Sequence, residues 1–394
     1  MRQWLWVGLA LAVALTAATA SGVRAALAGG TSTATPSAKC TRIAGVKVGG
    51  PISLTGSSAA VAGIPEARGE LQAVRDMETS HLLPRGAIKL ILSDTKSNPD
   101  ASPPAFTDLI RGNRVSAIVG ISDSPGALRI GGLVEDAGIP TIVGIATASQ
   151  LSEQGPHWYM VPLVKDYLFQ KTVPQIVQIL KLKGKTIGEL YQSDNDGVVS
   201  YHQYLTAAFQ AAGVKVVSES SLSTDNDYSA QLTKLRGENI AAFIPDGLVA
   251  SIPQMAIQAR QLGISVPMIG TPAMSGSSIL QQAGQALEGA IAPAAWYVGA
   301  PDPASKTFVA NYTKRFGGQP SLFAAEGYAA MQIFGAALQR ACSGDHNKIE
   351  AALQAVTKAG VNTIFGRITF DSTRHAIYGG YLVRVVKGQY VAAK

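Results

Sequence analysis

The sequence has few charged residues, and its basic residues form no stripe. These two features argue against a disordered chain and against a nucleic-acid-binding protein. Only 15% of the 394 residues are charged and 47% are hydrophobic, which is not the composition of a disordered chain. Its lysines and arginines are scattered, and the densest group is Lys181, Lys183 and Lys185. A nucleic-acid interface needs a basic stripe with interleaved aromatic residues. Although the net charge is +7, the basic residues are scattered, so we predict no nucleic-acid partner.

Motifs of nucleotide binding and hydrolysis are absent. The sequence contains no G-x-x-x-x-G-K-[ST], no G-x-G-x-x-G after a strand, no G-x-S-x-G and no H-E-x-x-H. Its five histidines lack the spacing of metal ligands. Asp-Asn runs at residues 193–197 and 224–228 resemble fragments of a calcium loop without the closing glutamate, so we interpret them as turns and helix caps. We expect no cofactor, no metal and no enzymatic activity.

The N-terminal residues have the organisation of a secretory signal. Met1 and Arg2 precede an apolar run from Trp4 to about Ala20, and small residues follow it. We predict a signal peptide over residues 1–25 and a flexible linker over residues 26–42. An uncleaved membrane anchor is the alternative, and no later run reaches the length of a membrane span. The expected location is the periplasm or another cell-envelope space.

The sequence has only two cysteines, Cys40 and Cys342. In an oxidising compartment an even number of cysteines favours a disulfide. Two unrelated thiols are one alternative, and a lipid-anchored Cys40 is another. The preceding Ser-Ala-Lys lacks the leucine and small residues typical of a lipoprotein site. We predict that Cys40 pairs with Cys342.

From residue 46 onward, strand-length apolar runs alternate with segments of helical period. One series contains "VKVGG", "IKLILSD", "VSAIVGI" and "IPTIVGI", and after a break near residues 157–163 a second contains "TIGELYQ", "VKVVSES", "AAFIPD" and "VPMIGTP". Repeated βα units imply parallel sheets covered by helices on both faces, so we predict two Rossmann-like α/β lobes. Helical stretches at residues 305–359 indicate a return to the first lobe. The predicted lobes are residues 43–162 plus 297–366 and residues 163–296 plus 367–394.

A loop of small residues follows the first predicted strand, in "VGGPISLTGSSAAVAG". Such a loop can hold an anion with backbone N–H groups, but this one lacks the lysine and the glycine spacing of a phosphate site. Ligands of parallel α/β folds bind at the carboxyl ends of the strands. The small side chains of residues 60–62 leave room there for a bulky or apolar ligand.

The whole pattern resembles the type I periplasmic binding proteins, and among them the branched-chain amino-acid receptors of ABC transporters. "GPISLTG", "VGISDSPGAL" and "GIPTIVGIATASQLSEQG" are similar to the family's binding loops. "IGELYQSDNDGVVSYHQ", "QARQLGISVPMIGTP" and "EGYAAMQIFGAAL" follow in the family's order. The resemblance covers nearly everything after about Ile43. It implies a monomeric receptor, not an enzyme, whose lobes close around a small-molecule ligand and deliver it to an ABC permease.

The resemblance also assigns ligand contacts. Ser124, Ala146 and Thr147 match the positions that hold a ligand carboxylate, where hydroxyls and backbone N–H groups solvate an anion without a paired charge. For Ser124 and Thr147, capping of the following helices is the alternative. The loop from Ser57 to Val61 matches the cleft lining. Phe323 matches an aromatic wall position, with a core aromatic as the alternative.

The sequence departs from the family pattern where amino-acid receptors have an acid for the ligand ammonium. Pro272 occupies that place, and two aromatic positions of the second lobe fall on Asp196 and Gly247. An unpaired buried ammonium is unfavourable, so an α-amino acid would need Asp246, or secondly Asp196, as its partner. We therefore predict a ligand with a carboxylate or another polar head and a partly apolar body. A ligand sensor with a signalling partner and an exported Rossmann-like enzyme are the alternative functions.

Overall fold

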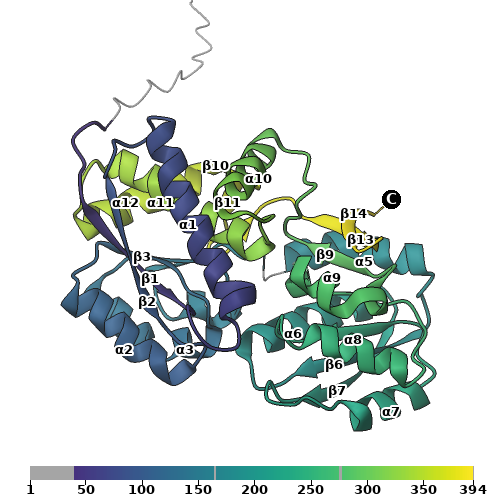
Figure 1. Cartoon of the computed structure of the whole chain (residues 1–394). Helices are drawn as coiled ribbons and strands as arrows, with labels where there is room; N and C mark the ends of the chain where they lie inside the picture. The colour runs from purple at the N-terminus through teal and green to yellow at the C-terminus, as the bar shows by residue number, and fades with distance from the viewer. Residues whose placement is uncertain (1–39, 164–165, 275–276, 394) are drawn as a thin grey trace, which may run out of the picture. The chain divides into compact units, whose positions relative to one another are not determined.

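The computed structural model describes residues 40–163, 166–274 and 277–393. The predicted signal peptide and most of the predicted linker, up to residue 39, lie outside the described residues. Within the described ranges, no helix is long and apolar enough to cross a membrane. The described chain has a mixed α/β architecture in which parallel sheets carry helices on both faces (Figure 1).

The first lobe is built on a five-stranded parallel sheet in the order β2-β1-β3-β4-β5. Its strands are β1 (Val46–Ile52), β2 (Ile88–Asp94), β3 (Ala117–Gly120), β4 (Thr141–Val143) and β5 (Trp158–Met160). Val48, Ala117 and Ile142 have no exposed surface, as expected for strands that are covered on both faces. The first four strands coincide with the runs of the first predicted series. β5 lies in the segment that was interpreted as a break.

Helices cover both faces of this sheet (Figure 1). One layer holds α1 (Ile64–Thr79), α10 (Pro303–Phe316), α11 (Leu322–Ala341) and α12 (His346–Ala359). The other holds α2 (Ser102–Thr107), α3 (Ser124–Leu128) and α4 (Gly131–Ala137). The short π-helix η1 (Ala59–Gly63) runs directly into α1. Since α11 packs along α1, the late helices complete the layer that the first helix begins.

The second lobe is built on two three-stranded sheets joined by a short segment. One is parallel, in the order β7-β6-β8, with β6 (Thr186–Gln192), β7 (Lys215–Ser221) and β8 (Phe243–Asp246). The other has the order β14-β13-β9, with β9 (Ile291–Ala294), β13 (Tyr381–Val386) and β14 (Gln389–Ala392). Met268 bridges to Phe243, and Ile269 bridges to Ile291. The two sheets therefore form one continuous surface.

Helices cover both faces of this surface (Figure 1). α5 (Asp166–Leu180) and α6 (Asp196–Ala211) share one apolar cluster with the sheet. α7 (Ser229–Gly237), α8 (Ile252–Gln261) and α9 (Ser277–Ala283) lie on the opposite face. The helices thus enclose the strands in two layers, and the loops at the carboxyl ends of β6, β7 and β8 stay free to line a site.

The return to the second lobe comes later in the chain than predicted. β10 (Val361–Thr363), β11 (Gly366–Phe370) and β12 (Ala376–Ile377) form a small antiparallel sheet. His375 bridges to Met160 of β5, and the Arg374 guanidinium donates a 3.0 Å hydrogen bond to the Trp158 carbonyl oxygen. Residues 367–377, assigned to the second lobe from the sequence, therefore pair with the first. Local hairpin pairing decides this, and apolar periodicity does not reveal it.

Cys40 and Cys342 form a disulfide, with 5.5 Å between their Cα atoms. The bond joins the first described residue to the end of α11, across 302 positions of sequence. It is the pairing that the sequence analysis favoured over free thiols.

Candidate ligand-binding site

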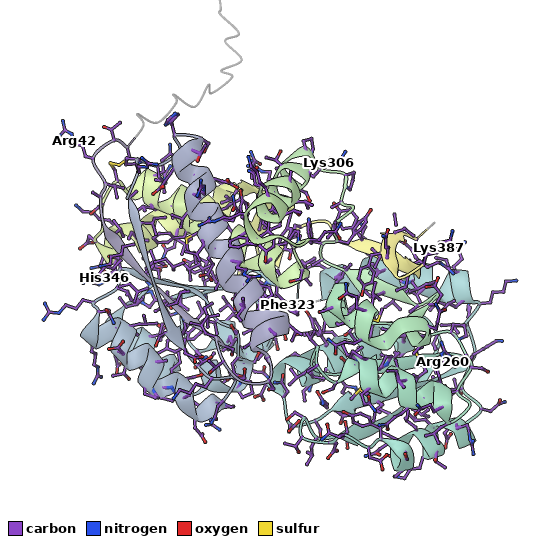
Figure 2. The ribbon with its side chains drawn as sticks, in the orientation of Figure 1. Arg42, Arg260, Lys306, Phe323, His346 and Lys387 are labelled. Atoms are coloured by element: carbon purple, nitrogen blue, oxygen red, sulfur yellow. A yellow bond between two sulfur atoms is a disulfide. The ribbon has the colours of Figure 1, made fainter. Side chains whose placement is uncertain are left out.

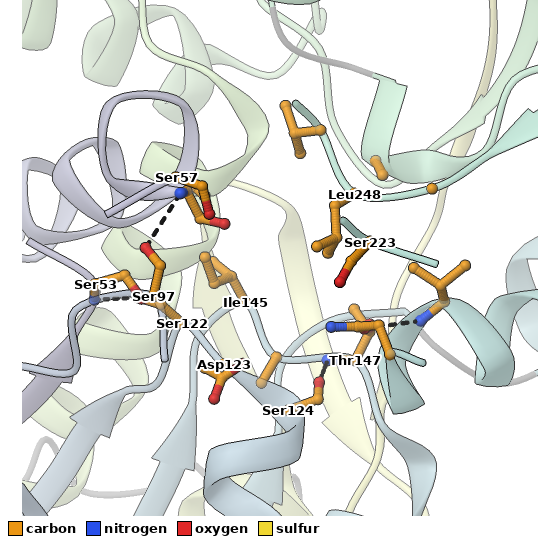
Figure 3. A pocket seen from close by; sticks show the side chains of 18 of the residues that line it. Ser53, Ser57, Ser97, Ser122, Asp123, Ser124, Ile145, Thr147, Ser223 and Leu248 are labelled. Atoms are coloured by element: carbon orange, nitrogen blue, oxygen red, sulfur yellow. Dashed lines mark hydrogen bonds between the residues drawn. The ribbon is translucent and has the colours of Figure 1, made fainter. Parts of the chain in front are cut away.

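A cavity of about 580 Å³ is lined by residues from both lobes (Figure 3). The first lobe contributes the loops that follow β1, β2, β3 and β4, and the second contributes those that follow β6, β7 and β8. Carboxyl ends of parallel strands are the usual binding location in such folds. The volume suits a small molecule.

Most residues predicted to contact a ligand line this cavity. The seven that do are Ser57, Val61, Ser124, Ala146, Thr147, Gly247 and Phe323. Phe323 is 9% exposed and lies on the side of the first lobe that faces the second (Figure 2). It belongs to the main apolar cluster as well as to the cavity wall, so the two roles predicted for it are compatible.

Three predicted residues, Asp196, Asp246 and Pro272, are not among the cavity-lining residues. Asp246 ends β8 and has no exposed surface. The chain turns after it, so that Gly247 and Leu248 reach the cavity in its place. Asp246 therefore does not present its carboxylate to a ligand ammonium as predicted.

Asp196 begins α6, and the cavity is reached instead by its neighbours Asp194 and Asn195. The Asn195 side chain caps α6 by accepting from the N–H groups of residues 197 and 198. The Asp194 carboxylate accepts from the backbone N–H and the hydroxyl of Ser223. The bonds between Asp194 and Ser223 hold the loops after β6 and β7 together at the cavity wall.

Asp94, at the end of β2, holds the small-residue loop that follows β1. Its carboxylate accepts from the N–H groups of residues 54, 55 and 96 at 2.8–3.1 Å and from Thr55 Oγ1 at 2.7 Å. Burial raises the pKa of Asp94, but these hydrogen bonds outweigh it and hold the pKa below its usual value. Gly56 has φ +89°, and a Cβ there would lie 2.3 Å from the Lys96 carbonyl oxygen. Only glycine fits this close approach.

Ser124 joins the loops that follow β3 and β4. Its Oγ accepts hydrogen bonds from the N–H groups of Thr147 (3.0 Å) and Ala148 (3.1 Å) (Figure 3). The cap of α3 is Asp123, whose carboxylate accepts from the Gly126 N–H at 2.8 Å. The alternative capping role of Ser124 is therefore wrong. Because a hydroxyl has two lone pairs and one proton, Ser124 keeps its proton to donate.

The cavity wall carries acids and no bases. Among the described residues that line it, none is Lys, Arg or His, whereas Asp123, Asp194 and Glu326 are present. Burial raises the pKa of Asp123, although the Gly126 N–H and the charge of Arg129 oppose the shift. An anionic ligand group would therefore be held here by neutral donors.

Glu326 is the main residue that the sequence analysis missed. It lies in α11, is only 3% exposed and lines the cavity. Burial and the nearby Glu66 hold the pKa of Glu326 well above its usual range. Glu326 is the single acid in the mostly apolar "LFAAEGYAAMQIFGAALQRA" of α11. A lone carboxylate in a buried helix is the signal by which it could have been found.

Comparisons with known proteins agree with this architecture. Residues 45–389 match the model of the periplasmic binding protein family. A leucine-, isoleucine-, valine-, threonine- and alanine-binding protein of Pseudomonas aeruginosa is 24% identical over 77% of this chain and 80% of its own length. The fold is similar to that of a leucine binding protein from Thermotoga maritima, with TM-score 0.80, 23% identity and coverage of 89% and 98% of the two chains. It is also similar to that of an R. palustris solute binding protein in complex with benzoate, with TM-score 0.78, 18% identity and coverage of 88% and 95%.

Proposed function

This chain belongs to the periplasmic binding protein family, and we propose that it is an extracytoplasmic receptor for a small carboxylate-bearing solute with a partly apolar body. The observation that carries the proposal is the two-lobed cavity with Ser124 at the junction of two strand-end loops. A cavity lined from both lobes can gain affinity by hinge closure around its ligand. No reaction is part of the proposal.

Neutral donors support the carboxylate end of the ligand. No described residue accepts a hydrogen bond from the Ser124 hydroxyl. The Thr147 hydroxyl lies against the backbone of Gly197, where a Cβ would be 2.4 Å from Oγ1. Gly197 is in the first turn of α6, whose amino end carries partial positive charge. Together these groups can solvate an anion without a buried cation.

Apolar side chains support the body of the ligand. They come from both lobes, and they are Val61, Ile145, Val198, Leu248 and Phe323. By their names, these relatives bind leucine, isoleucine, valine, threonine and alanine, or benzoate. These ligands share a carboxylate and an apolar body, which is the combination that this wall favours.

We further propose that the loaded receptor, a monomer, delivers its solute to an ABC permease. The R. palustris neighbour is described as part of an ABC transporter. Genes for permease and ATPase subunits beside the gene of this chain would support transport. A neighbouring signalling gene in their place would favour the sensor alternative.

A thermal-shift and calorimetry screen tests the receptor proposal. The probes are L-leucine, L-valine, benzoate, 3,4-dihydroxybenzoate and hexanoate, with benzamide as a neutral match for benzoate. A ligand that binds only the folded state stabilises it by about 2.7 kcal/mol at a hundred times its Kd. We expect at least one carboxylate to bind saturably and to raise the unfolding temperature. Benzamide should bind more weakly than benzoate. If no carboxylate binds, the proposal fails.

A further inference from the structure

One face of the cavity is backed by three buried carboxyl groups. Glu326 of α11 lines the cavity, and Glu66 and Glu70 of α1 lie behind it with no exposed surface. Burial raises the pKa of Glu66 to about 8, although the hydrogen bond from Ser122 opposes the shift. Burial and the charge of Glu66 hold the pKa of Glu70 well above its usual range. The pKa values of these three carboxyl groups are therefore raised by burial, and those of Glu70 and Glu326 also by the charge of Glu66, and no cation is among the causes that act on them.

The hydrogen bonds around these carboxyls are unevenly distributed. The Ser122 hydroxyl donates to Glu66 Oε2 at 2.5 Å and accepts from the Ser53 N–H at 3.1 Å, so its proton is used. Glu66 Oε1 and both oxygens of Glu70 have no partner among the described residues. None of the described residues donates to Glu326 either. Of the three acids, only Glu326 faces the cavity.

The second lobe does not supply the acid that the family pattern places there. Pro272 occupies that position, and Asp246 is fully buried away from the cavity. Tyr201 of α6 lines the cavity and lies near Glu326. Burial, and secondly the charge of Glu326, raise the pKa of Tyr201. Glu326 thus faces the cavity without a described hydrogen-bond donor, on a wall that contains no described cation.

We propose that Glu326 accepts a hydrogen bond from a donor group of the solute, so that the cavity selects carboxylic acids that also carry an amino or hydroxyl group. This inference rests on the proposed function, since it assigns the second polar contact of the same ligand. An unpaired buried acceptor is unfavourable until a donor reaches it. A solute without a donor would leave Glu326 in that state and bind more weakly.

Calorimetry on matched ligands tests the inference. L-leucine, 2-hydroxy-4-methylpentanoate and 4-methylpentanoate differ only in the group at one carbon: ammonium, hydroxyl or hydrogen. Benzoate and 3,4-dihydroxybenzoate form an aromatic pair. With the wild-type protein we expect at least one donor-bearing acid to bind about ten- to a hundredfold more tightly than its donor-free match.

Two variants of Glu326 separate charge from hydrogen bonding. Glu326→Leu removes the acceptor, so the preference for donor-bearing acids should disappear. Glu326→Gln keeps an acceptor oxygen but no charge, so a preference for a hydroxyl should persist while a preference for an ammonium falls. Glu350→Gln is the matched control, because Glu350 is a buried acid of the same lobe that accepts from the Tyr159 hydroxyl and does not line the cavity. It should leave every preference unchanged.

The outcomes separate this inference from the proposed function. If acids bind to the wild type but Glu326→Leu keeps the wild-type ratio between donor-bearing and donor-free ligands, the role of Glu326 is overturned and the receptor function stands. If no carboxylic acid binds to the wild type, the receptor function itself fails. The unfolding temperatures of both variants should be no lower than that of the wild type, since each replaces an uncompensated buried acid by a neutral residue.

Discussion

Two small polar residues at strand ends organise the first-lobe side of the cavity. Ser124 Oγ ties the loop after β4 to the start of α3, and Asp94 ties the loop after β1 to the end of β2. Both act by collecting backbone N–H groups that would otherwise lack partners. Their effects are local, and single substitutions measure them.

The Ser124→Ala variant should weaken carboxylate binding. It removes the donor proton proposed for the ligand and the acceptor that positions the N–H groups of residues 147 and 148. We expect the affinity to fall about ten- to a hundredfold, as for loss of a hydrogen bond to a charged group. Titration calorimetry with whichever carboxylate binds the wild type measures this.

Ser116→Ala is the control for that experiment. The Ser116 hydroxyl also donates a hydrogen bond, to the Gly344 carbonyl oxygen, but it lies outside the cavity lining. The Ser116→Ala variant should bind the same carboxylate with the affinity of the wild type. Equal affinity of Ser124→Ala would contradict the assigned role of Ser124.

The Asp94→Asn variant should be less stable at neutral pH and lose this difference in acid. A carboxyl whose pKa is lower in the folded than in the unfolded state stabilises the fold above its unfolded pKa, and this contribution disappears as the pH falls through the folded pKa. Asn keeps one acceptor oxygen, so we expect a loss of about 1 kcal/mol near pH 7. Urea unfolding of both proteins at pH 7 and at successively lower pH, well below the usual pKa of an aspartate, measures it. A difference that grew in acid would contradict the assignment.

At the scale of elements, two glycines set the approach of α1 to α11. A Cβ on Gly69 would lie 2.0 Å from the Ala324 carbonyl oxygen, and one on Gly327 would lie 2.6 Å from that of Glu66. Backbone meets backbone at this crossing, so a side chain cannot be accommodated by a rotamer change. The crossing also sets where Glu326 and Phe323 meet the cavity, which links helix packing to the site.

The Gly69→Ala variant should therefore be strongly destabilised. Separating the two helices opens the packed core along their length, and overpacking of this kind costs about 1–3 kcal/mol or more. The free energy of unfolding, measured with urea, reports the loss.

Gly132→Ala gives the opposite expectation in the same lobe. Gly132 is an exposed residue of α4 with no atom within 4 Å of the added Cβ. Alanine there should stabilise the protein by about 0.5–1 kcal/mol, because glycine is the poorer helix former. If Gly69→Ala and Gly132→Ala lost similar amounts of unfolding free energy, backbone contact at the α1–α11 crossing would not be the cause of the destabilisation.

At the scale of the molecule, the disulfide closes almost the whole described chain into one loop. It connects Cys40 with the end of α11 across 302 positions. A cross-link over so long a segment reduces the conformational freedom of the unfolded chain. The helices of the late segment are thereby tied to the strand that begins the first lobe.

The double variant Cys40→Ser, Cys342→Ser should lose about 2–5 kcal/mol of unfolding free energy. Chemical unfolding with and without reductant measures the loss. Reductant should lower the stability of the wild type toward that of the variant and leave the variant unchanged. An effect of reductant on the variant would show that the thiols are not its target.

The sequence by itself determined most of the strand and helix order, apart from β5, together with the two-lobed α/β class and the strand-end loops that line the cavity. Apolar periodicity and small-residue loops carry that information because they are local. It also indicated Ser124 and Thr147, since motif order along the chain places them at strand ends.

Only the tertiary structure decided which polar groups face the cavity. Asp246 is buried away from the cavity, whereas Glu326, from a mostly apolar helix, lines it. The pairing of residues 367–377 with the first lobe was also decided there. Orientation and pairing depend on what packs against each residue, and those partners lie far away in the sequence. Pattern along the chain therefore predicts which loops meet, and packing decides which side chains they present.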